Sequence, residues 1–254
     1  MTRDYSQVLT AAARQIKGIL FDKDGTLFDY HASWAPVNAG AALEAARGDA
    51  VLADRLLRAG GLDPATGRYA SGSLLAAAHT GEIAEEWARM MGLPAADLPD
   101  LIERLDRRFQ ELGPIHAAPV GDLPALMADL RSRGLVLGVA TSDSEQGARR
   151  MLADAGCGPD LIGFVAGYDS GHGGKPAPGM VYGFCQTTGL ESGSILVVGD
   201  NLHDIRMART AGCRLAVGVL TGTSLFEDLH EEADAVLDSI IEIPALLNGA
   251  SRVV

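Results

Sequence analysis

The sequence predicts an α/β protein with a doubly wound, mainly parallel sheet and an inserted α-helical domain. Three observations support this prediction. Short apolar runs recur along the chain, helical patterns separate the later runs, and one long stretch contains no such run at all. Alternation of strands with helices is typical of a Rossmann-like core in which helices cover both faces of a parallel sheet.

The apolar runs are expected to form buried strands. Each run is continuous rather than alternating between apolar and polar residues, as expected when both faces of a parallel sheet are covered. The runs are residues 18–22, 135–141, 163–167, 195–200, 214–220 and 235–238.

Helices are expected between the later strands. The patterns over 123–134, 144–156 and 201–212 each close with a glycine, which is a common signal for the end of a helix. Because strand, helix and strand follow one another through short loops, we expect right-handed crossovers and parallel pairing.

Residues 31–117 differ from the rest of the chain. They contain helical patterns but no apolar run of the strand type, and a segment rich in proline and glycine, 113–121, closes them. We therefore predict a catalytic core of residues 1–30 and 118–254 and a helical domain of residues 31–117. Two chain crossings would then permit a hinge beside a closable cleft. The alternative is that these helices extend the core.

Composition excludes several kinds of partner. The 254 residues carry a formal net charge of −12, which argues against binding to nucleic acid or to an acidic membrane surface. No apolar run approaches the ~20 residues that cross a bilayer, and the N-terminus lacks a signal-peptide pattern. Cys157, Cys185 and Cys213 form no CxxC pair and are expected to be reduced thiols. We expect a cytoplasmic monomer or homodimer.

Carboxylates follow two of the predicted strands. Asp22 and Asp24 come after the first strand, and Asp200 closes the run 195–200. Ligands of open α/β sheets bind beyond the carboxyl ends of the strands, where these acids would meet and repel one another. Because Mg²⁺ prefers hard oxygen ligands, the pattern predicts a magnesium site there.

Two charged residues are expected to support these acids. Asp204 follows Asp200 by one helical turn and could orient a metal-bound water or Lys175. Lys175 lies between two glycines and Pro176, where it could neutralise a phosphate or a nucleophile.

Two hydroxyl groups follow another strand. Thr141 closes the run 135–141 and Ser142 follows it, and a hydroxyl at this strand end could donate to a phosphate oxygen. On its own this signal is weak, because serine and threonine also commonly cap the next helix.

In these residues the chain resembles the haloacid dehalogenase superfamily, and within it the phosphatases related to phosphoglycolate phosphatase. The resemblance rests on four ordered motifs that span residues 18–212, and the helical stretch lies where that family carries its C1-type cap. The motifs are Asp22 to Thr26, Thr141, Lys175 in Gly-Lys-Pro, and Gly199 to Asp204.

The resemblance implies roles for these positions. Asp22 would attack phosphorus and form an aspartyl-phosphate, while Asp24 would protonate the leaving alcohol and then activate water. Asp22, the backbone carbonyl of Asp24, and Asp200 would bind Mg²⁺, with Asp204 in support. Thr141 and Lys175, with Ser142 and backbone donors around Lys23 and Asp24, would hold the phosphoryl group of a small phosphorylated metabolite.

Two positions depart from the family pattern. Lys23 stands between the two acids, where a neutral residue is more usual, and alternation should point its side chain away from the phosphate. Asn201 stands where Ser or Thr is more usual, and it should still cap the following helix.

Other functions remain open at this stage. A phosphomutase of the same superfamily would need extra cationic groups in its cap, and a non-catalytic regulator should have lost an acid or the lysine. A phosphonatase would need a Schiff-base lysine in the cap, and residues 31–117 contain no lysine. Asp24 argues against the dehalogenase branch.

Further residues, most of them in the helical stretch, could contact a substrate. Trp34 is expected to be core packing rather than part of the cleft, and His172 a solvated loop residue. The segment 67–82 offers Arg68, Tyr69, His79 and Thr80 to a substrate, and His31 could also face the cleft.

Overall fold

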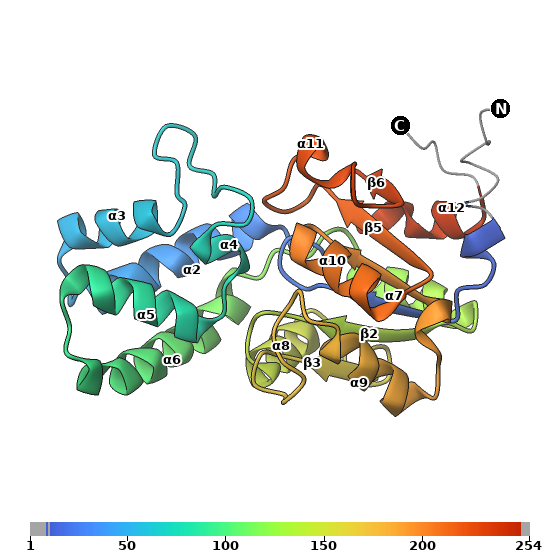
Figure 1. Cartoon of the computed structure of the whole chain (residues 1–254), viewed down its shortest axis with the longest axis horizontal. Coiled ribbons are helices and arrows are strands. Elements are labelled where there is room, and N and C mark those ends of the chain that lie inside the picture. Colours follow the sequence, from blue (N-terminus) through green and yellow to red (C-terminus); the bar gives the residue numbers. More distant parts are fainter. Residues whose placement is uncertain (1–8, 10, 250–254) are drawn as a thin grey trace.

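The computed structural model describes residue 9 and residues 11–249, which contain a six-stranded, fully parallel sheet (Figure 1). The strand order is β3-β2-β1-β4-β5-β6, which is the doubly wound arrangement that the sequence predicts. The strands are β1 (Gly18–Phe21), β2 (Val136–Ala140), β3 (Phe164–Ala166), β4 (Ile195–Gly199), β5 (Leu215–Val219) and β6 (Ala235–Leu237).

The register of the central strands places their carboxyl ends side by side. Phe21 at the end of β1 pairs with Val139 of β2 and with Val198 of β4. The residues that follow these strands therefore meet at one edge of the sheet.

Helices cover both faces of the sheet, as the continuous apolar runs predict. Ile19 and Phe21 pack in one cluster with α7 (Leu123–Ser132), α8 (Glu145–Asp154) and α12 (Ile243–Leu247). Leu20 points to the opposite face, into a cluster with α9 (Gly179–Thr188) and α10 (Leu202–Ala211). The short α11 (Phe226–Leu229) adds Leu229 to this second cluster.

The helices of the helical stretch lie to one side of the sheet (Figure 1). They pack around an apolar cluster of their own. Trp87, Leu101 and Leu105 are fully buried there. Its helices are α2 (Tyr30–Ala45), α3 (Ala50–Ala59), α4 (Leu74–Ala77), α5 (Thr80–Met91) and α6 (Leu98–His116). We call residues 30–116 the helical insertion; its independence as a domain stays a prediction.

Two helix boundaries within the insertion depend on particular residues. α2 and α3 are separate helices, because Arg47 and Gly48 have positive φ and Asp49 caps α3. In contrast, Gly113 and Pro114 do not stop α6, which ends at His116. A proline in the last turn forfeits a single backbone hydrogen bond, so the helix can continue past it.

None of the described helices combines the length and the hydropathy that a membrane span requires. The three cysteines that the sequence prediction treats as reduced are all free thiols in the structure.

Candidate active site

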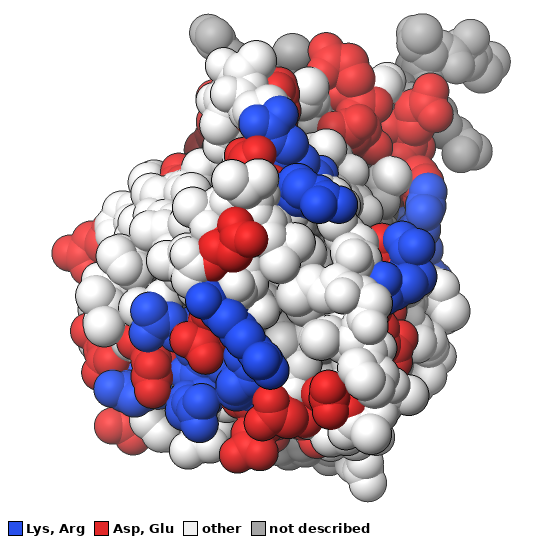
Figure 2. Space-filling model, turned by 90° about the vertical axis from the view of Figure 1, so that its left-hand side faces the viewer, with Lys and Arg blue, Asp and Glu red and all other residues white. Residues whose placement is uncertain are grey.

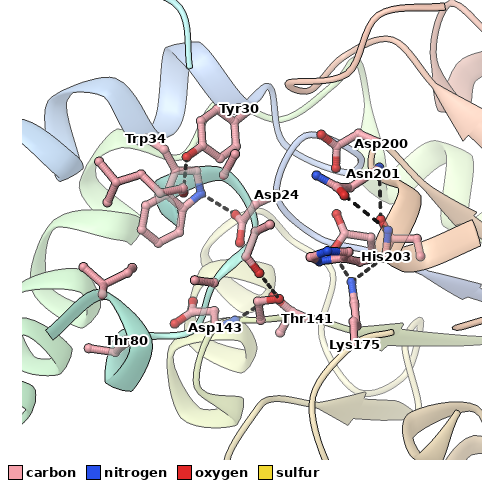
Figure 3. Close-up of a pocket in the computed structure, with 18 of the residues that line it drawn as sticks. Asp24, Tyr30, Trp34, Thr80, Thr141, Asp143, Lys175, Asp200, Asn201 and His203 are labelled. Carbon is pink, nitrogen blue, oxygen red and sulfur yellow. Dashed lines mark hydrogen bonds and ion pairs between the residues drawn. The ribbon is translucent and has the colours of Figure 1, made fainter. Parts of the chain in front are cut away.

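A small cavity of about 70 Å³ lies between the carboxyl edge of the sheet and the helical insertion (Figure 3). The core contributes charged and hydroxyl groups, and the insertion contributes mostly aromatic and apolar groups. The principal core residues are Asp22, Asp24, Thr141, Lys175, Asp200 and Asp204. The structure thus brings together Asp22 and Asp204, which are 182 positions apart in the sequence.

Lys175 joins two of the buried acids. Its Nζ lies 2.5 Å from Asp22 Oδ1 and 2.6 Å from Asp204 Oδ1. Burial lowers the pKa of Lys175, but the two carboxylates outweigh burial and raise it, so the ammonium stays charged at neutral pH. The prediction that Asp204 orients Lys175 agrees with this contact.

Asp22, Asp200 and Asp204 form a buried cluster of carboxylates. Each offers an oxygen within 4.8 Å of the others. Burial raises the pKa of Asp22 to about 6, with Lys175 opposing and Asp204 adding to the shift. Burial and the neighbouring Asp22 also raise the pKa of Asp200 well above its usual range.

The cluster fits a divalent cation. Its donors are all oxygens, and Asp22 Oδ2 is buried without a hydrogen-bond partner among the described residues. A cation would offset the repulsion between carboxylates, which adds to the effect of burial on these pKa values. The predicted ligands were Asp22, Asp200 and the backbone carbonyl of Asp24, with Asp204 in a supporting role. The carboxylate cluster in the structure contains Asp204 and not the Asp24 side chain.

The loop after β5 holds Asp200 in place. The backbone N–H of Thr223 donates to Asp200 Oδ2 at 2.8 Å. Gly25 and Gly222 approach the same carboxylate so closely that a Cβ on Gly222 would lie 1.8 Å from Asp200 Oδ2. Both glycines are therefore required by the close approach of backbone to an acid.

Asn201 and Asp204 begin α10 with a capping box. The Asn201 side chain accepts from the backbone N–H of His203 at 3.2 Å, and Asp204 Oδ2 accepts from the backbone N–H of Asn201 at 3.2 Å. Asn201 thus serves as the expected cap. His203 lines the cavity beside it, and burial, followed by Lys175, lowers its pKa, so its imidazole is neutral at pH 7.

Asp24 lies in a separate group of contacts from Asp22. Its Oδ1 accepts from Lys23 Nζ at 2.9 Å. It also accepts from Trp34 Nε1 of α2 at 2.5 Å (Figure 3). Lys23 also pairs with Asp143 Oδ2 at 3.2 Å. Burial raises the pKa of Asp24, and Lys23 opposes that shift.

The side chain of Lys23 is fully buried and does not line the cavity. Its Nζ lies 3.3 Å from Met151 Sδ and 5.3 Å from the centre of the Trp34 ring. Burial lowers the pKa of Lys23, but Asp24 and Asp143 outweigh burial and raise it. The side chain points away from the cavity, which agrees with the orientation expected from alternation.

Thr141 and Ser142 both line the cavity. Thr141 Oγ1 accepts from the backbone N–H of Asp143 at 3.1 Å, which fixes the turn after β2. The hydroxyl of Ser142 donates to the carbonyl of Ala77 in the insertion at 3.3 Å. Ser142 therefore joins core and insertion in this structure.

Sequence reasoning missed most of the insertion side of the cavity. Tyr30, Trp34 and Asn38 are spaced by four residues along α2 and present one helix face to the acids. The expectation that Trp34 is only core packing is therefore wrong. The signal was the spacing itself, on a helix that begins just after the acid motif. The other principal members are Thr80, Ile83 and Phe109.

Several candidates lie elsewhere. Tyr69 packs against Tyr30 and His31, and His79 caps α5 through its Nδ1. Arg68 and His31 do not line the cavity, whereas Thr80 does. His172 is partly exposed, packs against Phe164 and does not line the cavity.

Comparison with known proteins agrees with this geometry. Residues 16–212 match the family described as haloacid dehalogenase-like hydrolase. The chain belongs to the haloacid dehalogenase-like hydrolases. Among relatives of this hydrolase, a phosphonoacetaldehyde hydrolase of Bacillus cereus strain B4264 is 28% identical over 232 residues, covering 89% of this chain and 83% of that protein.

Solved structures of similar fold include two with different stated activities. A predicted phosphoglycolate phosphatase from Haemophilus somnus 129pt aligns with a TM-score of 0.70 at 21% identity, over 91% of this hydrolase and 98% of that chain. A β-phosphoglucomutase from Clostridium difficile aligns with a TM-score of 0.63 at 19% identity, over 92% and 97% of the two chains. These likenesses establish the haloacid dehalogenase fold.

Proposed function

We propose that this hydrolase is a Mg²⁺-dependent phosphatase that cleaves a small phosphorylated metabolite through an aspartyl-phosphate. The observation that carries the proposal is the environment of Asp22. One of its oxygens contacts the ammonium of Lys175. The other is buried beside Asp200 and Asp204, with no hydrogen-bond partner in the part of the chain that the structure describes. A carboxylate so arranged is a suitable nucleophile toward a phosphate ester.

In the first step an oxygen of Asp22 attacks phosphorus, and the bond from phosphorus to the alcohol oxygen breaks. Asp24 gives its proton to the departing oxygen, which its raised pKa favours. Lys175 balances charge on the phosphoryl oxygens, and the Thr141 hydroxyl at the cavity wall can donate to them.

In the second step Asp24, now ionised, accepts a proton from water. The water oxygen bonds to phosphorus, and the bond between phosphorus and Asp22 breaks. Inorganic phosphate and the free Asp22 carboxylate result. Lys23 and Trp34 hold Asp24 Oδ1, which leaves Oδ2 to exchange the proton in both steps.

Asp22, Asp200 and the backbone carbonyl of Asp24 would hold the metal, with Asp204 beside them. When bound, Mg²⁺ supplies positive charge that neutralises the transferring phosphoryl group. Its identity as magnesium is part of the proposal and follows from the all-oxygen donor set.

The test is phosphate release from 4-nitrophenyl phosphate by the purified protein. We expect turnover with Mg²⁺, loss of turnover with a chelator and recovery when Mg²⁺ is restored. Asp22→Asn should lower kcat by a factor of about 10⁴ or more, because no nucleophile remains. Wild-type turnover by Asp22→Asn would refute the assignment of the nucleophile.

Two other activities are less well supported by the insertion. A phosphomutase must hold a second phosphate, and no lysine or arginine of the described residues lines the cavity except Lys175. The activity of the related phosphonoacetaldehyde hydrolase is also less well supported, because residues 31–117 contain no lysine that could form a Schiff base. Lys23 does not replace it, because its side chain is fully buried.

The cytoplasmic location and the monomeric or homodimeric state belong to the proposal as well. Three free cysteines suit a reducing compartment. The small-molecule partner follows from the size of the cavity, which is about 70 Å³.

A further inference from the structure

The two walls of the cavity differ in charge. The core wall carries five carboxylates, those of Asp22, Asp24, Asp143, Asp200 and Asp204, together with Lys175. The insertion wall carries no charged side chain among the residues that line it. Its principal members are Tyr30, Trp34, Asn38, Thr80, Ile83 and Phe109.

The insertion contains cationic side chains, but none of them lines the cavity. Residues 31–117 contain eight arginines and no lysine. Several pair with acids on the outer surface, for example Arg89 with Glu86 at 2.5 Å and Arg104 with Asp100 at 2.9 Å. Figure 2 views this side of the molecule and shows positive and negative side chains next to one another.

The core wall offers little positive charge to a second anionic group of the substrate. Lys175 already contacts Asp22 and Asp204 and lies where it would meet the transferring phosphoryl group. An anion on the alcohol part of the substrate would therefore face an uncharged wall and the carboxylates of Asp24 and Asp143. Burial of a charge without a partner is strongly unfavourable.

The insertion wall has instead the features of a site for a neutral group. Trp34 and Phe109 pack edge to face, with ring centres 5.7 Å apart, and offer apolar surface. Asn38 and Thr80 add an amide and a hydroxyl that can bind a substrate hydroxyl. The cavity volume of about 70 Å³ is small beside the roughly 300–1,000 Å³ of pockets for drug-sized ligands.

We propose that the substrate is the phosphate monoester of a small, uncharged alcohol, and that the insertion wall discriminates against carboxylates and second phosphates on the leaving group. This inference rests on the proposed phosphatase function. It also departs from the family-level expectation of phosphoglycolate, whose leaving group carries a carboxylate.

The experiment compares esters that differ by one group. Phosphoglycolate is paired with 2-hydroxyethyl phosphate, and 3-phosphoglycerate with glycerol 3-phosphate, so that a hydroxymethyl group replaces each carboxylate. Phosphate release by the Mg²⁺-loaded protein gives kcat/KM for all four esters. We expect the neutral member of each pair to be favoured by about tenfold or more.

A variant pair tests the cause. Ala77 lines the cavity from the end of α4 and is partly exposed. Ala77→Arg places a cation on the insertion wall, and Ala77→Gln places an uncharged side chain of similar length there. We expect Ala77→Arg to raise the ratio of kcat/KM for phosphoglycolate over 2-hydroxyethyl phosphate by about tenfold relative to Ala77→Gln.

The outcomes separate this inference from the function on which it rests. If the wild type cleaves the carboxylate esters as well as their neutral partners, the inference is overturned while the phosphatase function stands. If neither these esters nor 4-nitrophenyl phosphate releases phosphate, the function itself fails. If Ala77→Arg does not fold, the wild-type comparison still decides.

Discussion

Lys23 is unusual for a lysine because its side chain is fully buried. Lysine is almost never fully buried unless it is paired, and Lys23 is fully buried between Asp24 and Asp143. Its ammonium also lies over the ring of Trp34. One side chain thus connects the proposed proton donor, the turn after β2 and the first helix of the insertion.

Replacement of Lys23 by methionine should destabilise the protein. Asp24 and Asp143 would remain buried without their cation, and loss of one partner from a buried ion pair costs about 3–5 kcal/mol. We expect the free energy of unfolding in urea to fall by about that amount.

Lys17→Met is the matched control, because Lys17 is exposed and belongs to none of the ion pairs found among the described residues. Equal stability of Lys23→Met and Lys17→Met would show that the buried pairing contributes nothing. A selective loss of stability in Lys23→Met would support the arrangement described above.

At the scale of single elements, the loop after β5 determines the position of Asp200. The loop donates a hydrogen bond to Asp200 from the backbone N–H of Thr223. It also places Gly222, which has no side chain, directly against the carboxylate. Such a loop gives no strong signal in the sequence, since its role depends on an acid that is 22 residues earlier and comes from another strand.

Gly222→Ala should impair the metal site. The added methyl group would overlap Asp200 Oδ2, so the carboxylate must leave its present position in the cluster. We expect kcat/KM for 4-nitrophenyl phosphate to fall by tenfold or more, and the Mg²⁺ concentration for half-maximal activity to rise.

Gly158→Ala provides the control, because a Cβ on Gly158 meets no atom within 4 Å. Activity should be measured over a range of Mg²⁺ concentrations for both variants. Unchanged dependence on Mg²⁺ in Gly222→Ala would contradict the role given to this loop.

For the whole molecule, the carboxylate cluster sets a limit on stability in the absence of metal. The chain already carries a net charge of −12, and Asp22, Asp200 and Asp204 add repulsion inside the fold. A divalent cation that binds only the folded state would stabilise it by mass action.

The metal-free protein should therefore lose stability as pH rises through the raised pKa of Asp22. The pKa of this group is about 6 when folded, above its ordinary value of 3.8. Its stabilising contribution is thus fully present below about pH 4 and is lost on ionisation, amounting to about 3 kcal/mol. Asp200, whose pKa is also raised, acts in the same direction.

Thermal unfolding of wild type and Asp22→Asn, with and without Mg²⁺, measures this effect. Without metal, Asp22→Asn should be more stable than wild type near pH 7, and the difference should vanish near pH 4. Mg²⁺ should raise the Tm of wild type more than that of the variant. A Tm of wild type that does not respond to Mg²⁺ would argue against a metal site.

The sequence alone determined the sheet, the helices that cover it and the acids at its edge. Continuous apolar runs, terminal glycines and strand-end polar residues are local signals, and parallel pairing necessarily brings strand ends together. Asp22, Asp24, Thr141, Lys175, Asp200 and Asp204 consequently meet as the motifs predict.

Only the tertiary structure decided how the insertion completes the site. Local periodicity shows that α2 is a helix but not which face it turns toward the acids, because side-chain packing between insertion and core fixes that orientation. The contact of Trp34 with Asp24, the pairing of Lys23 with Asp143 and the uncharged insertion wall all follow from this packing. The sequence therefore predicted the chemical groups of the core, whereas the selectivity proposed for the cavity depends on the packing of two segments that are distant in the sequence.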